Sequence, residues 1–415
     1  MPDIRNKRLL LISHHNSYRI APYIKAAINL GLEVTIASEG QHSLVSEVAN
    51  GLHIDFADTD STLKAILKEN RRKAFSGILG SDDQTVELAA HAAESLGLAH
   101  NPPQAALCSF RKDLARAQLA LSGCPVPIHC LLDLTRPIKK QMAGLPWPCV
   151  LKPLNMSASR GVIRVNNEDE FLAACERLKP IVATASGEFE QRHVLIEDYI
   201  DGIEIAYEGF LHNAVLNSIT IFDKPDPLVG PYFEETIYVT PSTLSENLQQ
   251  RIKQVLQKAC AAYGLTTGPV HAECRIDKNS NIWILEIASR TIGGDCARML
   301  DNDSFSIEEL AISLAINQPL EVTMPQQARG VMMIPIRQKG LLKRVEGLLE
   351  ANKIKHIDKI DIIIRQGHEL LPLPEGNQYL GYIFASADRP EQVTAAIRQA
   401  YSLLKFVTAP VFKIV

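Results

Sequence analysis

The sequence predicts a chain of the α/β and α+β classes that is divided into several units. Near the N-terminus, strands and helices alternate, which is typical of a parallel α/β unit. Around residues 270–287, two short apolar runs flank a polar turn, which is typical of two adjacent antiparallel strands. The chain has 415 residues, and a domain usually has about 100–200. We therefore expect several compact units.

Composition excludes several classes of protein. With 46% hydrophobic and 22% charged residues, the chain is ordinary for a globular protein. Its formal net charge of -4 gives no general basic face for nucleic acid. The apolar run Leu9–Ile12 is too short for a signal peptide, and no window reaches the length of a membrane span. We therefore expect a cytoplasmic protein that binds neither nucleic acid nor membranes.

The eight cysteines form neither a CxxC pair nor a zinc-binding spacing. In a cytoplasmic protein, cysteines of this kind are reduced thiols. Because such thiols behave as small apolar side chains, we expect a structural role for them and no catalytic cysteine.

The N-terminal unit is predicted from the order of its apolar runs. The expected elements are strand 8–12, helix 20–30, strand 33–37, strand 77–79 and helix 85–96. Ligands of open α/β sheets bind at the carboxyl ends of strands, so His14, His15 and the turn Ser81–Asp83 could line a cleft. No GxGxxG follows the first strand, so a dinucleotide site is not supported. Polar turn residues are the simpler interpretation of the two histidines.

Two lysines and a small-residue loop follow. Lys112 and Arg116 stand four residues apart on one face of a predicted helix, which is typical of a solvated charged face. Lys152 ends a short apolar strand, where a lysine is costly unless an anion meets it. The loop 155–162, with the sequence NMSASRGV, exposes backbone N–H groups that can hold phosphates. Polar turns between strands look similar.

Residues 194–200 and 203–209 predict two strands joined as a hairpin by Asp201-Gly202. Glu197 and Glu204 in these strands could accept hydrogen bonds from ribose hydroxyls, or they are ordinary hairpin carboxylates. Residues 225–232 contain Gly230-Pro231 and predict a mobile loop. An amphipathic helix is expected over residues 245–263.

Glu273 and Glu286 interrupt the two apolar runs of the antiparallel pair. Burying an unpaired carboxylate is costly, so two of them on neighbouring strands indicate a cation between them. Carboxylate oxygens suit magnesium, which shares its coordination shell with waters and substrate phosphates. The alternative is that both residues are partly exposed strand glutamates without a function.

Arg290 and Gly293-Gly294-Asp295 follow Glu286 closely. An arginine beside a metal site can bind phosphate or carboxylate oxygens with two hydrogen bonds. The paired glycines let the backbone approach a ligand. A surface arginine is the alternative interpretation.

The candidate residues occur in an informative order along the chain. In this order they are Lys112, Lys152, the 155–162 loop, Glu197, Glu204, Glu273, Glu286 and Arg290. Their order and spacing resemble the ATP-grasp superfamily of carboxylate–amine ligases, from the first strand to about residue 325. The most specific motifs are EDYIDGIE at 197–204 and Glu273 followed by EIASR at 286–290.

A narrower resemblance is to the L-amino-acid ligases, which join unprotected amino acids into dipeptides. It rests on the Glu-x-Ala-x-Arg form at 286–290, on GPVHAE at 268–273 and on the tail segments 330–335 and 379–382. The chain departs from the wider superfamily at Ala288, where many members have an asparagine as a further metal ligand. A second metal ion would then be held differently or weakly. The 155–162 loop also has fewer glycines than is common.

The resemblance implies an ATP-grasp fold, in which an N-terminal α/β unit precedes an ATP site between two α+β subdomains. The N-terminal unit would be 1–104, the small subdomain 105–190, the large subdomain with the metal site 191–328, and a C-terminal α/β subdomain 329–415 would pack on the core. The expected elements of the last unit are strands near 331–336, 361–365 and 379–387 and a helix at 390–404.

The resemblance also implies nucleotide contacts at matching positions. Lys112 and Lys152 would bind the phosphates of ATP, and Lys152 would also lie near the adenine. Glu197 and Ile200 would contact adenine, and Glu204 the ribose hydroxyls. The remaining nucleotide contacts are expected at Ser157, Ser159, Gly161 and Tyr199.

Glu273 and Glu286 would hold magnesium, or manganese in its place. Arg290 would face the γ-phosphate and the acyl phosphate, and with Lys152 it would be catalytic. The candidates for contact with the amino-acid substrate are His271, Gly293, Gly294 and Asp295. A satisfied core histidine is the other interpretation of His271.

The implied reaction joins a small carboxylate, such as an amino acid, to an amine through an acyl phosphate, with release of ADP and phosphate. The partners are then small molecules, and a homodimer is one assembly open to the chain. A closing lid would protect the acyl phosphate from water, and the 225–232 loop is a candidate. Two alternatives stay open: an ATP-grasp enzyme that uses bicarbonate or formate, and a nucleotide-binding regulator without turnover.

Overall fold

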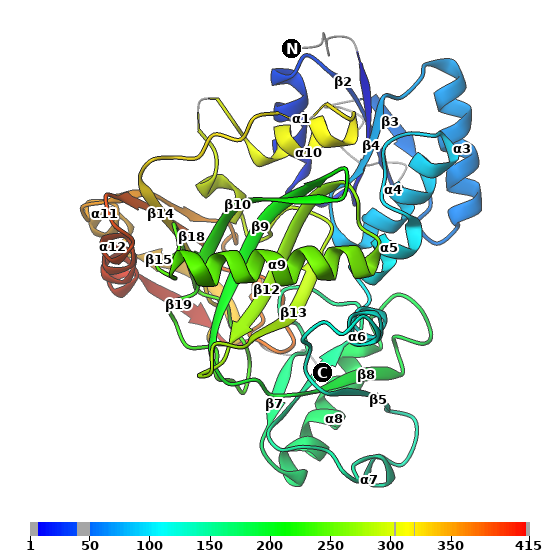
Figure 1. Cartoon of the computed structure of the whole chain (residues 1–415). Coiled ribbons are helices and arrows are strands. Elements are labelled where there is room, and N and C mark those ends of the chain that lie inside the picture. Colours follow the sequence, from blue (N-terminus) through cyan, green and yellow to red (C-terminus); the bar gives the residue numbers. More distant parts are fainter. Residues whose placement is uncertain (1–6, 40–49, 303, 319, 412–415) are drawn as a thin grey trace.

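The computed structural model describes residues 7–39, 50–302, 304–318 and 320–411. A parallel sheet at the N-terminus is followed by three antiparallel sheets, which confirms the predicted α/β and α+β classes. Figure 1 shows the N-terminal unit above the large central sheet and a small four-stranded sheet below it.

The N-terminal unit is a four-stranded parallel sheet in the order β3-β2-β1-β4. Its described elements are β1 (Arg8–Ile12), α1 (Ile20–Asn29), β2 (Glu33–Ser38), β3 (Asn50–His53), α3 (Thr59–Arg72), β4 (Gly77–Gly80) and α4 (Asp83–Ser95). Leu9 and Leu11 pack with residues of α1, whereas Leu10 and Ile12 pack with residues of α4. The central strand is therefore buried on both faces, as in other parallel sheets.

The small sheet has the order β5-β8-β6-β7. The elements of this region are α5 (Pro103–Cys108), α6 (Lys112–Leu121), β5 (His129–Asp133), α7 (Ile138–Gln141), β6 (Cys149–Pro153), β7 (Ile163–Val165), α8 (Glu168–Val182) and β8 (His193–Asp198). β8 pairs with β5 and β6 and not with the strand that follows it, so the predicted hairpin over 194–209 is wrong. The division between the two sheets falls after Asp198, because β8 belongs to the small sheet, and not at residue 190.

The large sheet has eight strands in the order β13-β12-β9-β10-β11-β14-β18-β16. Its first part consists of β9 (Ile203–His212), β10 (Val215–Asp223), β11 (Ile237–Thr240), β12 (Gly268–Ile276) and β13 (Ile282–Ala288). The predicted amphipathic helix is α9 (Glu246–Tyr263), which runs across these strands in Figure 1. Ile252 and Leu256 of α9 pack with Ile284 and other residues of the sheet in one apolar core.

The C-terminal unit continues the large sheet, because β14 pairs with β11 on one side and β18 on the other. Its elements are β14 (Ala328–Ile334), β15 (Gly340–Glu346), α11 (Leu348–Ala351), β16 (Ile357–Ile362), β17 (Glu369–Leu370), β18 (Gly381–Ala387), α12 (Pro390–Leu403) and β19 (Lys405–Ala409). The 3-10 helix η1 (Cys296–Met299) and α10 (Ile307–Ala315) precede it. β15, β17 and β19 form a separate three-stranded sheet.

All eight cysteines lie in the described part of the chain as free thiols, and all except Cys130 are buried. This agrees with the predicted structural role. Within the described residues, no helix combines the length and the apolar character needed to cross a membrane.

Candidate active site

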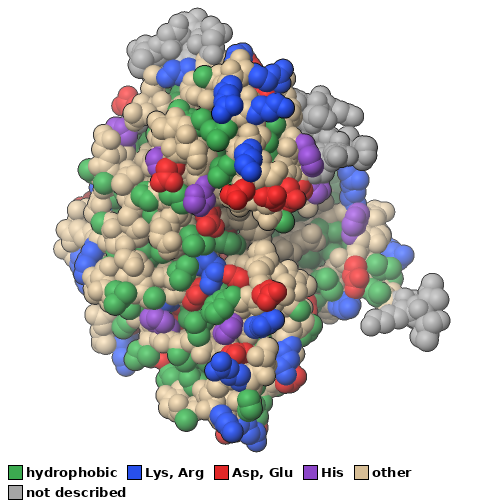
Figure 2. Space-filling model, turned by 90° about the vertical axis from the view of Figure 1, so that its right-hand side faces the viewer, with side chains coloured by type: hydrophobic (Ala, Val, Ile, Leu, Met, Phe, Trp, Pro, Cys, Tyr) green, Lys and Arg blue, Asp and Glu red, His purple; other side chains and the backbone are tan. Residues whose placement is uncertain are grey.

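A cavity of about 790 Å³ lies where the units meet, and each of them lines part of it. One face of the molecule is hollowed, and acidic side chains gather along the edge of the hollow (Figure 2). The predicted residues that line the cavity are His14, Asp82, Asp83, Lys112, Lys152, Ser157, Ser159, Glu197, Tyr199, Ile200, Glu204, His271, Glu273, Glu286, Arg290, Gly293 and Gly294. The predicted residues His15, Ser81, Gly161 and Asp295 are not among its lining residues.

Lys152 reaches the cavity from β6 and is held by Glu197 of the neighbouring β8. Lys152 Nζ lies 2.6 Å from Glu197 Oε2, and Arg116 Nε of α6 lies 2.5 Å from Glu197 Oε1. Burial alone would raise the pKa of Glu197, but Arg116 and Lys152 together lower it to about 2. Glu197 is therefore ionised and fixes Lys152. Arg116 is only 1% exposed, so its placement on a solvated charged face was wrong.

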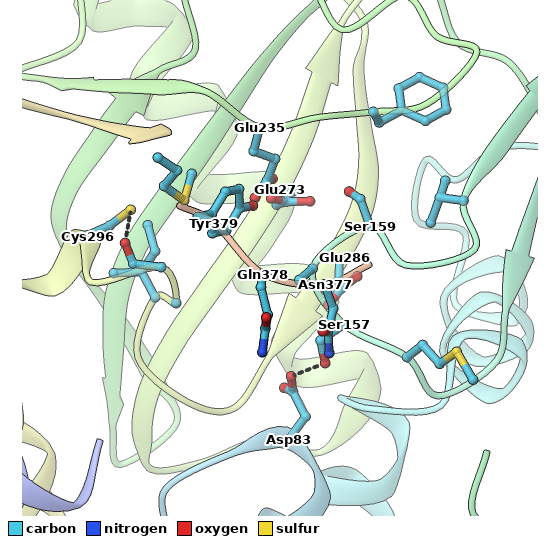
Figure 3. Close-up of a pocket in the computed structure, with 18 of the residues that line it drawn as sticks. Asp83, Ser157, Ser159, Glu235, Glu273, Glu286, Cys296, Asn377, Gln378 and Tyr379 are labelled. Carbon is cyan, nitrogen blue, oxygen red and sulfur yellow. Dashed lines mark hydrogen bonds between the residues drawn. The ribbon is translucent and has the colours of Figure 1, made fainter. Parts of the chain in front are cut away.

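Lys112 begins α6 and connects the small-residue loop to Glu286 of β13. Its Nζ donates to the carbonyl of Met156 over 2.9 Å and lies 3.4 Å from Glu286 Oε2. Ser157 and Ser159 of this loop line the same cavity as Glu286, and all three side chains are labelled in Figure 3. The backbone N–H groups of such a loop, together with two lysines, can hold an anion.

Gly161 supports this loop without lining the cavity. Its φ is +73°, and a Cβ atom at this position would lie 2.5 Å from the side chain of Pro153. Only glycine fits such a conformation and such a close approach. We therefore attribute a backbone-shaping role to Gly161.

Lys224 and three glutamates of the cavity wall form a second buried polar cluster. Lys224 Nζ donates to Glu204 over 2.8 Å, to Glu235 over 2.7 Å and to Glu273 over 2.8 Å. Ligand oxygens of these three carboxylates lie within 4.8 Å of one another, which is close enough to hold a metal ion. The ammonium group of Lys224, 3% exposed, instead lies among them. Glu204 uses its second oxygen to accept from Arg275 Nε over 2.8 Å.

The protonation of this cluster follows from its charges. Burial raises the pKa of Glu235 to about 7, since the opposing effect of Lys224 is partly offset by the charge of Glu273. Burial also opposes ionisation of Glu273, but Lys224 and a hydrogen bond from Glu235 hold its pKa well below the usual range. Glu235 therefore takes up a proton more readily than Glu273, which stays ionised.

The two predicted metal ligands lie on adjacent strands. Glu273 of β12 is the register partner of Glu286 of β13, and the labelled side chains both point into the cavity in Figure 3. Residues paired in this way project from the same face of a sheet. Ala288 is fully buried and pairs with His271 across the two strands. Its methyl side chain cannot supply the further metal ligand discussed above for this position.

Arg290 follows β13 and pairs with Asp83 at the start of α4. Burial raises the pKa of Asp83, but Arg290 outweighs it and lowers the pKa, so the pair is ionic. Ser157 Oγ also donates to Asp83 over 3.0 Å, as the dashed line in Figure 3 marks. Asp83 thus joins the N-terminal unit to both the loop and the arginine.

His271 of β12 lines the cavity and is tied to a buried acid. Its Nδ1 lies 2.5 Å from Glu208 Oε1, and Glu208 is fully buried. Burial raises the pKa of Glu208, although His271 opposes this effect. One ring nitrogen is therefore occupied, as in a core histidine, while the residue remains at the cavity wall.

The loop after Arg290 is shaped by the N-terminal unit. The backbone N–H of Gly294, whose φ is +61°, donates to the hydroxyl of Tyr18 over 3.1 Å. Asp295 pairs with Arg298 over 2.9 Å. Gly293 and Gly294 are therefore positioned at the cavity, whereas Asp295 has a partner outside its lining.

The predicted lid loop lies against the small sheet. The backbone N–H of Arg164 in β7 donates to the carbonyl oxygen of Pro231 over 2.8 Å, and Arg164 Nη1 donates to the carbonyl oxygen of Val229 over 2.6 Å.

An ion pair joins the region of the small sheet to the C-terminal unit, where Arg177 Nε of α8 lies 2.6 Å from Glu375 Oε1.

Sequence reasoning missed Lys224 and Glu235. Lys224 comes directly after strand β10 and precedes Pro225, and Lys152 similarly precedes Pro153, the last residue of β6. The argument that identified Lys152 would therefore have identified Lys224. Glu235 has no comparable signal, because it lies in an irregular segment between β10 and β11.

Three family models match the chain. They are an ATP-grasp N-terminal domain over residues 24–100, an ATP-grasp domain over 145–299 and an L-amino acid ligase C-terminal domain 2 over 332–409. Together they include β2, β3 and β4 of the N-terminal sheet, both strands of the predicted metal site and most of the C-terminal unit.

Curated relatives and solved structures agree with these models. The alanine–anticapsin ligase of Bacillus subtilis is 26% identical over 249 residues, which cover 56% of this chain and 52% of that ligase. The L-arginine-specific L-amino acid ligase of Bacillus subtilis is 20% identical, covering 95% of this chain and 97% of that protein. The crystal structure of an L-amino acid ligase from Bacillus licheniformis has a TM-score of 0.80 at 23% identity and covers 98% of this chain and 99% of that one.

Proposed function

We propose that this chain, which belongs to the ATP-grasp proteins and resembles the L-amino-acid ligases, joins an amino acid to an amine at the expense of ATP. It is an ATP-dependent ligase of the type that links a carboxylate to an amine. The carboxylate is activated as an acyl phosphate, and ADP and phosphate are released. Amino-acid substrates are proposed because the relatives named above are amino-acid ligases.

One observation carries the proposal. Lys112, Lys152 and Arg290 line the same cavity as Glu273 and Glu286. Three cations can neutralise a triphosphate and a transferred phosphoryl group, and two carboxylates can hold the accompanying metal ion. Neither set alone would favour a phosphoryl-transfer site, but the two sets together do.

The nucleotide is proposed to lie between the small and the large sheet. Lys152 and the loop with Ser157 and Ser159 would bind its phosphates, with Lys112 at the metal side. Tyr199 and Ile200, which follow β8 at the cavity wall, would contact adenine. Glu197 supports this site by holding Lys152.

Glu204 is proposed to accept hydrogen bonds from the ribose hydroxyls. Its contacts with Lys224 and Arg275 fix the position of its carboxylate. Its two oxygens already accept from these cations, but each carboxylate oxygen has more than one lone pair. Each oxygen of Glu204 therefore keeps the capacity to accept a further hydrogen bond from a ribose hydroxyl.

The donor set at β12 and β13 fits magnesium. Glu273 and Glu286 offer carboxylate oxygens on one face of adjacent strands, and Glu273 is ionised. Magnesium, when bound, neutralises phosphate charge and makes the γ-phosphorus easier to attack. The role of the protein residues is to hold the ion and to orient the phosphates.

The proposed reaction has two displacements. An oxygen of the substrate carboxylate attacks the γ-phosphorus, the bond to the β-phosphate oxygen breaks, and ADP leaves. The neutral amine then attacks the acyl carbon, the bond to the phosphate oxygen breaks, and the amine loses a proton. No protein nucleophile is needed, because positioning and charge stabilisation lower both barriers. Arg290 and Lys152 would stabilise the charge on the transferred phosphoryl group.

Phosphate release in the presence of ATP and magnesium tests the proposal. Single amino acids and all pairs of them are added in turn, and the products are identified by mass spectrometry. Release that depends on an amino acid, with a product of the mass of an amide, is the expected result. Release with bicarbonate or formate but with no amino acid would assign a different ATP-grasp reaction, and ATP binding without turnover would indicate a regulator.

A further inference from the structure

Arg290 and Asp83 form a two-point ion pair between units. Arg290 Nε donates to Asp83 Oδ1 over 2.6 Å, and Arg290 Nη2 donates to Asp83 Oδ2 over 2.8 Å. The exposed fractions of the side chains are 11% and 10%. A paired fork of this kind fixes the plane of the guanidinium group as well as its position.

The remaining donors of Arg290 are limited in number. Arginine has five N–H donors. Asp83 takes one on Nε and one on Nη2, and the carbonyl of Thr291 takes one on Nη1 over 2.9 Å. One N–H on Nη1 and one on Nη2 are left without a partner among the described residues. These are the donors that can serve a ligand in the cavity.

Asp83 is itself held rigidly. It is the first residue of α4, where the partial positive charge of the helix N-terminus favours a carboxylate. Ser157 of the 155–162 loop donates to Asp83 Oδ2. A carboxylate fixed from two sides is a support for Arg290 and not a mobile group that competes for it.

We propose that Asp83 is a positioning residue that turns the two free N–H groups of Arg290 toward the γ-phosphate. This inference rests on the proposed function. It assigns to the N-terminal unit an indirect part in recognising ATP, because Asp83 acts through Arg290. The hydrogen bond from Ser157 also fixes the 155–162 loop to Asp83.

Nucleotide binding tests the inference without turnover. Calorimetry compares the affinity for MgADP with that for the magnesium complex of the β,γ-imido analogue of ATP, which has a γ-phosphate. The wild type should bind the analogue more tightly than MgADP. Asp83→Asn should reduce the ratio of the two affinities about tenfold, since a charged hydrogen-bonded pair is lost. The matched control is Asp60→Asn, an exposed first-turn aspartate of α3, which should keep the preference.

A double mutant separates positioning from a general structural effect. Arg290→Lys cannot form the fork, so it should reduce the preference by itself, and adding Asp83→Asn should change little more. Additive losses would overturn the inference, as would an unchanged preference in Asp83→Asn. A stronger preference in Asp83→Asn would show that Asp83 competes for the arginine. If Asp83→Asn does not fold, Arg290→Lys alone must still lose the preference.

The same measurement separates this inference from the proposed function. A wild type that binds neither nucleotide would refute both. A wild type that prefers the analogue, together with an Asp83→Asn variant that prefers it equally, would refute only the role of Asp83.

Discussion

Glu273 and Glu286 face each other across the antiparallel pair β12 and β13, yet they have different partners. Glu273 accepts from Lys224, whereas Glu286 lies near Lys112. The side chain of Glu286 is 30% exposed and that of Glu273 19%. Of the two, Glu286 is therefore the carboxylate that can change partners more easily when a ligand binds.

Glu286→Gln should abolish ATP-dependent turnover and leave the fold intact. The change removes one negative charge from the proposed magnesium site but keeps the size and the hydrogen-bonding capacity of the side chain. Phosphate release measures turnover, and circular dichroism with thermal unfolding checks the fold. Glu321→Gln, at an exposed position, is the control. Near-normal turnover in Glu286→Gln would refute the metal role.

Lys224→Met should destabilise the protein by about 3 kcal/mol, because it leaves three neighbouring carboxylates without their shared cation. Urea unfolding measures the loss, and Lys353→Met, at an exposed position, should cost little. Since the three carboxylates can converge on an ion, millimolar magnesium should restore part of the stability of Lys224→Met and change the wild type less. A loss below about 1 kcal/mol would contradict the account of this cluster.

Arg177→Ala should raise the KM for ATP about threefold with little change in thermal unfolding. The Arg177–Glu375 pair joins α8 of the small sheet to the C-terminal unit, and a half-exposed pair contributes only about 0–1 kcal/mol to stability. Its loss should instead loosen the closure of the small sheet over the nucleotide. Arg192→Ala is the matched control, because Arg192 pairs with Glu188 within the same unit. Equal KM values for both variants would rule out a role in closure.

Because of Glu308, the free energy of unfolding should fall as the pH rises. Burial, followed by the charge of Asp301, raises the pKa of Glu308 from 4.5 to about 7. The folded state then binds this proton more tightly than the unfolded state, so the stabilisation is present below pH 4.5 and is lost as the pH rises to about 7. The free energy of unfolding should fall by about 2–3 kcal/mol from this group over that range.

Glu308→Gln tests this dependence, because glutamine does not titrate. Denaturant unfolding of the variant should vary less between about pH 5 and pH 8 than that of the wild type, with Glu321→Gln as the control. Equal pH dependence of Glu308→Gln and the wild type would contradict the assignment.

The sequence predicted elements that depend on local patterns. β12 and β13 are joined by a short turn, and α9 has a regular apolar face, so periodicity is sufficient for both. β8 was paired wrongly, because its partners β5 and β6 are not its immediate neighbours in the sequence and its own pattern is that of any buried strand.

The candidate site was predicted in part for a related reason. Glu273 and Lys152 each break an apolar run, which is visible in the sequence. Arg116 looked solvent-exposed, because the helix alone does not reveal that Arg116 is buried and pairs with the buried Glu197. The convergence of Glu204, Lys224 and Glu235 depends on how β9, β10 and the segment before β11 come together.

The pairing of β11 with β14 has a consequence for how the chain can be divided. Removing the residues from Ala328 onward would leave the N–H and C=O groups of β11 without partners along one side. It would also uncover Ile237 and Val239, which share an apolar core with Ile334 and Ile397. Open strand edges beside apolar surface recruit strands from other chains. The C-terminal unit therefore covers this strand edge and its apolar residues, and a chain shortened at Ala328 should aggregate.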